Sequence, residues 1–377
     1  MKTILLESKI DRSPRVIQLE GMFDLPLEKV SKTEIPLNIP NLSERDWNVG
    51  LIVGPSGSGK STIAKNLFNT ELQKSENFKW SQDKAVIDDF PKGMTIKEIT
   101  ELLSSVGFSS PPAWLRPYST LSNGEQFRVS MARVMAETVE NEIAVVDEFT
   151  SVIDRTVAKI GSVAIGKTIR RRNQKFVAVG CHYDIQEWLQ PDWVYEPATG
   201  NFRWEYLQQR PNVELTIFRA NYEAWNSFSR HHYLTKDLNK SAQIYVGCID
   251  GQPAVMTAIL PMVHGFIKDG KRISRTVVLP DFQGIGLGNT FVNAICAGLK
   301  AQGFSVYTTT SHPARIRALN KSNQWSMIRK PSRVAKQGPK ANKGLVSSGS
   351  RITASFQYAG DADAQVAKIL APKPIKQ

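Results

Sequence analysis

The apolar residues of this 377-residue chain form two successive blocks of strands and helices, separated by a polar segment at residues 208–212. Short apolar runs predict strands at 16–19, 35–39, 49–53, 143–146, 176–180 and 193–197 in the first block, and at 213–217, 243–249, 254–260, 277–279 and 304–307 in the second. Apolar residues at helical spacing lie between them, at 63–68, 96–103, 127–135 and 291–299. This alternation predicts an α/β first domain, followed by a smaller α+β domain.

The clearest chemical motif follows the apolar run at residues 49–53. Residues 54–62, Gly-Pro-Ser-Gly-Ser-Gly-Lys-Ser-Thr, match the P-loop pattern and lie between a predicted strand and a predicted helix. Such a loop surrounds phosphates with backbone N–H groups, while its lysine reaches the β- and γ-phosphates and its serine hydroxyl binds Mg²⁺. The residues assigned to ATP are Gly54, Ser56, Gly57, Gly59, Lys60, Ser61 and Thr62. A glycine-rich loop that binds nothing is the less favoured interpretation, because the flanking strand and helix fit a phosphate site.

A second apolar run, at residues 143–146, ends in two carboxylates. Downstream of a P-loop, this pair fits a nucleoside triphosphate site in which Asp147 holds Mg²⁺ with Ser61 and Glu148 polarises the attacking water. The competing interpretation is a buried strand whose acidic end provides only solvation.

Together these motifs resemble the ATP-binding cassette (ABC) ATPase family. Residues 121–126, Leu-Ser-Asn-Gly-Glu-Gln, are similar to the family signature LSGGQ, with Asn123 in place of a glycine and Glu125 in place of the glutamine. The resemblance implies an ATP-dependent, head-to-tail homodimer. In that dimer, Ser122 and Gly124 of one chain contact the nucleotide that is bound to the other.

Two further residues extend this resemblance, and one feature departs from it. Asp154 resembles the D-loop aspartate, and His182 resembles the switch histidine that contacts the γ-phosphate. There is no clear Q-loop glutamine, and Asp88 or Asp89 stands in its neighbourhood. The segment between P-loop and signature is also short for a transporter cassette. The sequence therefore favours a soluble ABC ATPase over the ATPase subunit of an ABC transporter.

The second block contains a glycine-rich loop of its own. Residues 283–288, Gln-Gly-Ile-Gly-Leu-Gly, follow the apolar run at 277–279 and precede a predicted helix. Several backbone N–H groups at a helix start favour an anion. The glycine spacing is not that of the dinucleotide-binding fingerprint, and no acidic residue follows it.

This loop resembles the GNAT acyltransferase family, whose motif Q/R-x-x-G-x-G/A is met by Gln283, Gly286 and Gly288. The resemblance implies a cradle, formed also by Gly284, for the pyrophosphate of acyl-coenzyme A, with acetyl-coenzyme A as the favoured form. It also implies a splayed strand near residues 275–279 that presents the thioester.

Acyl transfer to an amine needs a group that takes the amine proton and donors that stabilise the oxyanion. Two histidine clusters lie outside the apolar periodic segments, His231-His232-Tyr233 and Ser311-His312-Pro313. The candidates are His232, Tyr233 and His312. Ordinary surface or core histidines are the alternative, and whether the domain retains catalysis stays open.

The C-terminal part of the chain is basic over a long interval. No acidic residue occurs between Asp281 and Asp361, and Trp325 lies among the basic residues. Lysine and arginine neutralise phosphates, and an aromatic ring can stack on an exposed base. The candidate contacts to DNA or RNA are Arg329, Lys330, Arg333 and Lys336. The alternative is a solvated loop that attracts only the phosphates of coenzyme A.

A third, looser resemblance concerns the same region. The His231-His232-Tyr233 sequence and the basic C-terminal stretch are similar to Mom-type DNA-modification proteins of bacteriophages, which have a GNAT-like fold and alter adenine. This resemblance covers about the last 150 residues.

Composition narrows the choice of partner and compartment. The net charge of +13 and the pI of about 9.6 favour a polyanionic partner, although positive charge also serves solubility. Three widely separated cysteines argue against a disulfide framework or a zinc site. No signal peptide is found, and no apolar run approaches the roughly 18 residues of a membrane span, so we expect a cytoplasmic protein.

The sequence predicts an ABC-type ATPase domain at residues 1–210, a GNAT-like acyltransferase domain at 211–360 and a C-terminal tail at 361–377. The leading hypothesis is an ATP-hydrolysing, Mg²⁺-dependent homodimer whose second domain is an N-acyltransferase that modifies or binds nucleic acid. The main alternative is an ATP-gated nucleic-acid clamp whose GNAT fold has lost catalysis.

Overall fold

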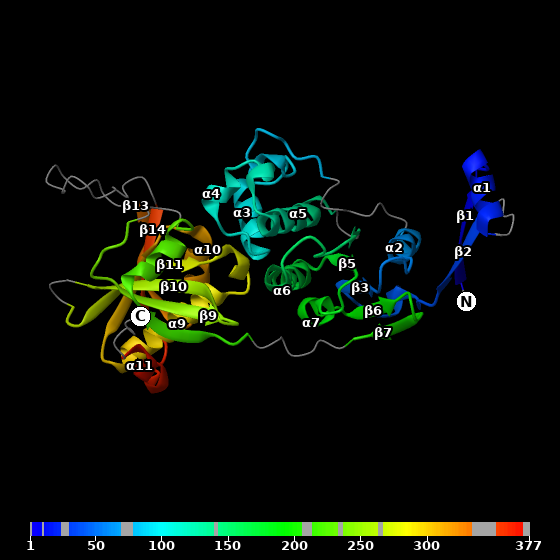
Figure 1. Cartoon of the computed structure of the whole chain (residues 1–377). Helices are drawn as coiled ribbons and strands as arrows, with labels where there is room; N and C mark the ends of the chain where they lie inside the picture. The colour runs from blue at the N-terminus through cyan, green and yellow to red at the C-terminus, as the bar shows by residue number, and fades with distance from the viewer. Residues whose placement is uncertain are drawn as a thin grey trace. The chain divides into compact units, whose positions relative to one another are not determined.

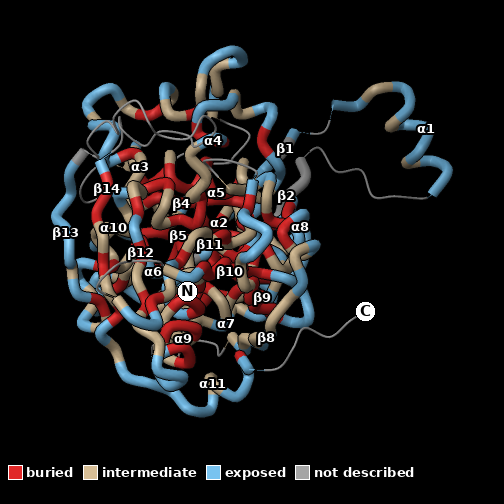
Figure 2. The backbone as a smooth tube through the Cα atoms, turned by 90° about the vertical axis from the view of Figure 1, so that its left-hand side faces the viewer, coloured by how far each residue is buried: buried red, intermediate tan, exposed pale blue. Residues whose placement is uncertain are grey.

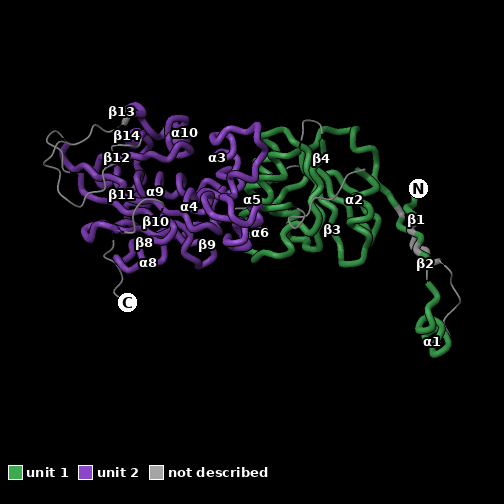
Figure 3. The backbone as a smooth tube through the Cα atoms, turned by 90° about the horizontal axis from the view of Figure 1, so that it is seen from above, with its two compact units in different colours: residues 1–80, 129–211 green, residues 81–128, 212–377 purple. Residues whose placement is uncertain are grey.

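The computed structural model describes residues 2–9, 11–23, 30–68, 78–138, 142–205, 213–232, 237–262, 267–333 and 352–371 (Figure 1). The chain divides into two compact units, shown in green and purple in Figure 3. Unit 1 comprises residues 1–80 and 129–211, and unit 2 comprises residues 81–128 and 212–377. The predicted linker at 208–212 lies outside the described residues.

Unit 1 is built on a five-stranded sheet with the strand order β4-β5-β3-β6-β7. Its strands are β3 (Val49–Val53), β4 (Ile143–Val146), β5 (Lys175–Gly180), β6 (Trp193–Glu196) and β7 (Asn201–Trp204). The pairs β4·β5, β5·β3 and β3·β6 are parallel, and β7 turns back antiparallel. The carboxyl ends of β3, β4 and β5 therefore meet at one edge of the sheet.

The central strand of this sheet is β3, and all of its residues are buried. Trp193 of β6 lies over β3, and a Cβ atom at Gly50 would come within 2.1 Å of its indole ring. The covering helices are α2 (Lys60–Phe68), α6 (Arg155–Arg172) and α7 (Ile185–Leu189). Helix α5 (Asn123–Glu137) begins in unit 2 and continues into unit 1.

The N-terminal residues of unit 1 form a separate two-stranded sheet of β1 (Lys2–Lys9) and β2 (Val30–Leu37). The strand predicted at residues 16–19 is wrong, because these residues lie in helix α1 (Pro14–Phe23). A proline at the first helical position and Ser13, whose hydroxyl accepts from the N–H of Val16, start this helix. These local signals outweigh the short apolar run.

Unit 2 is built on a seven-stranded sheet with the order β13-β14-β12-β11-β10-β9-β8. The strands are β8 (Thr216–Ala220), β9 (Gln243–Ile249), β10 (Gln252–Pro261), β11 (Gly270–Val278), β12 (Ser305–Thr310), β13 (Trp325–Arg333) and β14 (Ile352–Tyr358). Only the β11·β12 pair is parallel. It covers residues 270–273 of β11, whereas pairing with β10 reaches Val278. Strand β11 is thus splayed away from β12 over its last residues.

Helices cover both faces of the unit 2 sheet. They are α8 (Trp225–Ser229), α9 (Leu287–Ala301), α10 (Pro313–Lys321) and α11 (Ala364–Leu370). Trp225 of α8 packs on Met256 on one face, whereas Phe291 of α9 approaches Gly247 on the other. Leu370 packs against Gly298 of α9, so a helix occupies part of the predicted C-terminal tail.

Residues 81–128 also belong to unit 2 and form a small helical layer. Their helices are α3 (Ile96–Ser105), α4 (Pro111–Trp114) and the first residues of α5. A capping box between Thr95 and Glu98 starts α3. Asp89, one of two residues in the neighbourhood of a Q-loop, accepts hydrogen bonds from the N–H and hydroxyl of Ser81.

The predicted fold class is confirmed, with a parallel α/β sheet around the P-loop and a largely antiparallel α+β sheet in the second unit. The second unit is not the smaller one, because it also includes residues 81–128. Buried residues, red in Figure 2, are concentrated along the central strands. Short 3₁₀ turns complete the described structure at Leu42–Glu44, Val86–Asp89, Tyr118–Thr120, Tyr222–Ala224 and Pro280–Phe282. Among the described residues, no helix has the length and apolar character needed to span a membrane.

Candidate functional site

The P-loop has the backbone of a phosphate cradle. Gly57 and Gly59 have φ angles of +80° and +81°, a region that side-chain-bearing residues rarely adopt. The Lys60 ammonium donates to the carbonyl of Pro55 at 2.7 Å, so it is held at the loop. The buried hydroxyl of Ser58 has no hydrogen-bond partner within the described structure. The loop therefore combines a glycine backbone with positive φ angles, the Lys60 ammonium and the Ser58 hydroxyl, a set of groups that fits a triphosphate.

The carboxylates follow β4, which lies two strands from β3 at the same edge of the sheet. Ser61 at the start of α2 donates its hydroxyl hydrogen to Oδ2 of Asp147 at 2.8 Å, and Oδ1 of the same carboxylate accepts from the N–H of Glu148 at 3.0 Å. Asp147 is only 7% exposed, whereas the side chain of Glu148 is exposed. Two adjacent oxygen ligands of this kind fit Mg²⁺.

His182 and Asp154 complete this edge of the sheet. His182 follows β5, which lies between β3 and β4, so it emerges between the P-loop and Asp147. Gly54 of the P-loop donates its N–H to the carbonyl of Gly180 at the end of β5. Asp154 caps helix α6 and accepts from the N–H of Thr156, and this hydrogen bonding lowers the pKa of Asp154 below its usual value.

The signature residues lie in unit 2, at the start of α5. The N–H and hydroxyl of Ser122 donate to Oε2 of Glu125 at 2.9 and 3.1 Å, and the Ser122 hydroxyl accepts from the N–H of Glu125 at 3.4 Å. This is a capping box, and it starts the helix. Ser122 is exposed and Gly124 is half-buried. Glu125 thus occupies both donors of Ser122.

The glycine-rich loop of unit 2 opens toward solvent where α9 begins. Gly284 and Gly286 have φ angles of +98° and +87°, and Gly286 is the N-cap residue of α9. A Cβ atom at Gly288 would lie 3.0 Å from Cγ2 of Val278, whereas the space around Gly286 is open. A 15-residue helix with an open, side-chain-free N-terminus fits a pyrophosphate.

Gln283 is engaged within the protein at both ends of its amide. Its Nε2 donates to the carbonyl of Val278 at 2.9 Å, and its Oε1 accepts from the N–H of Ser109 at 2.8 Å. Gln283 thus joins the end of β11 to the helical layer of residues 81–128. Its side chain shapes the loop.

The candidate acid–base residues lie on different elements. His312 is the N-cap residue of α10, at the carboxyl end of β12, and burial together with Arg315 and Arg317 lowers its pKa. His232 packs edge-to-face on Trp225, with ring centroids 5.9 Å apart. Tyr233 lies outside the described residues.

The proposed nucleic-acid contacts lie at a sheet edge. Arg329 and Lys330 are exposed on edge strand β13, where Arg329 donates to the hydroxyl of Thr353 at 2.8 Å. The side chain of Arg333 and all of Lys336 lie outside the described part of the chain.

Stacking of a base on Trp325 is contradicted. The ring is 6% exposed, its Nε1 donates to Asn293 at 2.8 Å and it packs against Tyr358. Trp325 is therefore a core residue.

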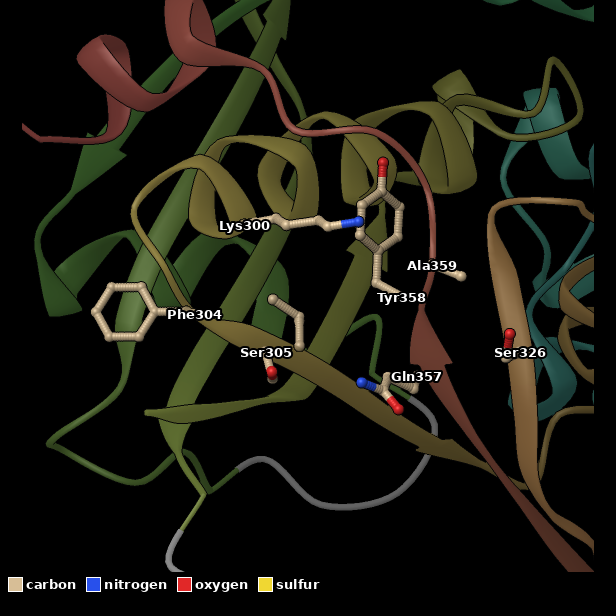
Figure 4. A pocket seen from close by; sticks show the side chains of 8 residues that line it. Lys300, Phe304, Ser305, Ser326, Gln357, Tyr358 and Ala359 are labelled. Carbon is tan, nitrogen blue, oxygen red and sulfur yellow. The ribbon is translucent and has the colours of Figure 1, made fainter. Parts of the chain in front are cut away.

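A pocket of about 310 Å³ lies elsewhere in unit 2 (Figure 4). Its lining residues are Lys300, Phe304, Ser305, Val306, Ser326, Gln357, Tyr358 and Ala359. The Lys300 ammonium is held by the carbonyl of Gly360 at 2.7 Å. Lys300 is near the C-terminal end of α9, roughly 20 Å along the helix from Gly286 at 1.5 Å per residue. The pocket is therefore separate from the glycine-rich loop.

Sequence reasoning missed Arg128, which is 1% exposed and donates to backbone carbonyls of the loop after β11. The only signal was its position in α5, between the apolar residues Phe127 and Val129. A charged residue on a helix among apolar residues does not indicate which distant backbone it contacts.

No protein-family model and no curated protein matches the chain. Solved structures similar to it include a bacterial Atm1-family ABC exporter with ATP bound, with 20% identity, a TM-score of 0.32 and coverage of 45% of this chain and 33% of the exporter chain. Another is cbiO1 from Clostridium perfringens, part of the ABC transporter complex cbiONQ, with 19% identity, a TM-score of 0.34 and coverage of 48% and 81%.

The similar structures also include the IAA acetyltransferase from Bacillus cereus, with 14% identity, a TM-score of 0.29 and coverage of 38% of this chain and 99% of that one. ABC proteins and acetyltransferases are both among the similar structures. The chain matches about a third of the length of the Atm1-family exporter. The Mom-type resemblance stays a prediction.

Proposed function

We propose that this protein is an ATP-hydrolysing ABC-type ATPase fused to a GNAT-like acyltransferase that acts on or binds nucleic acid. The ATPase half of this proposal rests on the hydrogen bond between Ser61 and Asp147, which lies beside a P-loop whose Lys60 contacts the Pro55 carbonyl. The observation that carries the transferase half is the splayed end of β11 leading into an open glycine loop and α9. Calorimetric titration of the full chain with ATP, and separately with acetyl-coenzyme A, tests both halves.

In the ATPase half, each residue has a defined task. Lys60 would exchange the Pro55 carbonyl for phosphate oxygens, while Ser61 and Asp147 would hold Mg²⁺, which neutralises charge on the phosphates. Glu148 would orient and polarise the attacking water, since its carboxylate is exposed beside the buried Asp147. Ser122 and Gly124 of a second chain would complete the site in an ATP-dependent homodimer, as the family resemblance implies.

In the transferase half, the acceptor amine would attack the thioester carbonyl of acyl-coenzyme A. A neutral histidine takes the amine proton as the new carbon–nitrogen bond forms. The carbon–sulfur bond then breaks, and the coenzyme A thiolate leaves and takes the proton from the imidazolium. The glycines at 284, 286 and 288 would hold the pyrophosphate with backbone N–H groups. The end of β11 beyond its pairing with β12 would supply backbone N–H donors to the pantetheine and the oxyanion.

The pH dependence of acyl transfer tests the histidine. Because the pKa of His312 is lowered from 6.5, its neutral, proton-accepting form is present throughout the neutral range. This form is lost only when the pH falls below the lowered pKa. We expect kcat/KM for acetyl-coenzyme A to fall on an acidic limb below pH 6.5 and to be flat above it. His312→Gln should lower the rate at neutral pH by roughly 100-fold and abolish the limb. If His232→Gln has this effect and His312→Gln does not, the assignment of His312 is wrong.

Salt dependence tests the nucleic-acid contacts. If Arg329 and Lys330 neutralise phosphates, replacing both with alanine should reduce the slope of log affinity against log salt by about two, because each contact contributes about 0.9. The measurement is fluorescence anisotropy with labelled DNA and labelled RNA between 50 and 200 mM salt, a range of about fourfold. The control removes the same charge from Lys92 and Lys97, which are exposed on the helical layer. Equal slopes in both double variants would remove β13 from the interface.

The alternative is an ATP-gated clamp without transferase activity. Binding of nucleic acid that depends on ATP, with no binding of acetyl-coenzyme A, would favour it. The fit of the glycine loop to a pyrophosphate makes it the less favoured of the two.

A further inference from the structure

Helical residues 81–128 pack on the start of the glycine-rich loop, and Arg128 is the centre of this contact. Nη1 of its guanidinium donates to the carbonyls of Pro280 and Gly107, and Nη2 donates to the carbonyl of Asp281 at 2.9 Å. The side chain is 1% exposed. A planar guanidinium presents several donors in a fixed arrangement, so it holds neighbouring carbonyls together in a way that a lysine cannot.

The charge of Arg128 is kept inside the protein by two nearby carboxylates. Burial lowers the pKa of Arg128 to about 10, and Asp281 and Glu125 partly offset that effect. The guanidinium therefore stays charged at neutral pH. Asp281 belongs to the loop, whereas Glu125 belongs to the signature sequence. The buried Arg128 guanidinium therefore interacts electrostatically with a carboxylate from each motif. A buried charge is costly unless it is compensated, so a change at either carboxylate affects Arg128.

Further contacts hold the loop to the helical layer. The amide of Gln283 is bound by the N–H of Ser109 at 2.8 Å. Gly107 has a φ angle of +89°, and a Cβ atom there would lie 2.5 Å from the carbonyl oxygen of Gln283. Glu101 forms an ion pair with Arg317 of α10. The position of residues 280–283 is thus set by the layer that carries the signature.

At the signature end of this layer, Glu125 holds Ser122. Both donors of Ser122 are occupied by the carboxylate of Glu125. A phosphate that binds to Ser122 must displace this carboxylate. Glu125 and Arg128 are three residues apart, which places them on the same face of α5. The displaced carboxylate then competes with the carbonyls of Pro280 and Asp281 for the guanidinium.

We propose that Arg128 is a positioning residue that couples the signature sequence to the acyl-coenzyme A loop, an inference that rests on the proposed function. When a triphosphate engages Ser122, Glu125 shifts to Arg128, the hold on residues 280 and 281 weakens and acyl-coenzyme A binds less tightly. Because coupling between two ligands is reciprocal, acyl-coenzyme A weakens triphosphate binding by the same factor. Hydrolysis returns the loop to its holding state.

The test is the ratio of acetyl-coenzyme A dissociation constants measured by calorimetry on the full chain with and without saturating Mg²⁺ and adenylyl-imidodiphosphate, a non-hydrolysable ATP analogue. We expect the analogue to weaken binding about fivefold or more in the parent, the lower end of typical coupling factors. Arg128→Lys should bring the ratio close to one. A purely structural role would change both constants equally and leave the ratio intact.

Two further variants sharpen the test. Arg133→Lys is the matched control, because Arg133 lies on the same helix but donates to Glu137 and to the carbonyl of Lys79; it should keep the parent ratio. Glu125→Gln removes the carboxylate charge, while glutamine still forms the capping box and keeps α5 intact. It should therefore also bring the ratio of dissociation constants close to one. This variant decides the question if Arg128→Lys does not fold.

Hydrogen–deuterium exchange at the amides of residues 284–288 provides a readout that needs no acetyl-coenzyme A. The analogue should accelerate exchange there in the parent and in Arg133→Lys, but not in Arg128→Lys or Glu125→Gln. Unchanged exchange in the analogue-bound parent, or an unchanged response in both coupling variants, overturns the proposal. If acetyl-coenzyme A does not bind the parent at all, the acyltransferase function fails, while the exchange measurement still decides whether the two motifs are coupled.

Discussion

Glu148→Gln is expected to bind ATP as the parent does but to hydrolyse it at least ~100-fold more slowly, the scale lost with other key catalytic groups. Glutamine keeps the size of the side chain and its hydrogen-bonding ability, but it cannot polarise water as a carboxylate does. The Ser61–Asp147 contact does not involve the Glu148 side chain, so the Mg²⁺ ligands stay in place. The measurements are phosphate release and equilibrium binding of a fluorescent ATP analogue.

The same variant should trap a dimer in the presence of ATP, because the closed state is no longer opened by hydrolysis. Light scattering at several protein concentrations would detect this dimer. Glu142→Gln is the control, since Glu142 is an exposed carboxylate just before the same strand, β4. It should hydrolyse ATP normally and form no trapped dimer. Near-normal turnover in Glu148→Gln would remove Glu148 from the catalytic role.

Gly286→Asp is expected to weaken acetyl-coenzyme A binding by up to about 30-fold. A charge at a helix N-terminus is worth up to ~2 kcal/mol, and each 1.4 kcal/mol corresponds to about a factor of ten. The introduced carboxylate would repel the pyrophosphate. It would also accept hydrogen bonds from the first N–H groups of α9, since aspartate is a favourable N-cap residue.

The matched control for this substitution is Gly286→Asn. Asparagine has nearly the same shape, tolerates the left-handed backbone at this position and caps helices equally well, but it carries no charge. Calorimetry should show a clearly smaller loss for asparagine than for aspartate. Equal losses would mean that the side chain blocks the loop by its size, and no loss in either variant would place the pyrophosphate elsewhere. Thermal unfolding of both variants checks that α9 is intact.

Local sequence signals were sufficient for the strands and loops that carry the chemistry. The P-loop, the carboxylates after residues 143–146 and the glycines at 283–288 each combine a short apolar run with residues of special backbone or charge. A glycine with positive φ or an acid at the end of a buried strand is determined by its immediate neighbours. For the same reason, the helix after residue 286 followed from the pattern, whereas the parallel pairing around β3 came only from the structure.

Some errors arose where a short pattern was ambiguous. The apolar run at 16–19 fits a strand as well as a helix, and Pro14 with Ser13 decided in favour of α1. The position of Trp325 among basic residues in the sequence suggested a ring that could stack on a base. In the structure its neighbours are Asn293 and Tyr358, which come from other elements. A residue's burial depends on those distant neighbours.

By itself, the sequence determined the two glycine-rich loops, their order and the strong positive charge of the C-terminal half, because each of these depends only on residues close together in the chain. Only the tertiary structure decided that residues 81–128 pack with the second unit, that Gln283 is bound by Ser109 and that Arg128 is buried against the loop after β11. Helical periodicity shows that one face of α3 or α5 is covered, but it does not identify the covering surface. Contacts between residues more than 150 positions apart depend on how whole layers pack, and no local pattern records that.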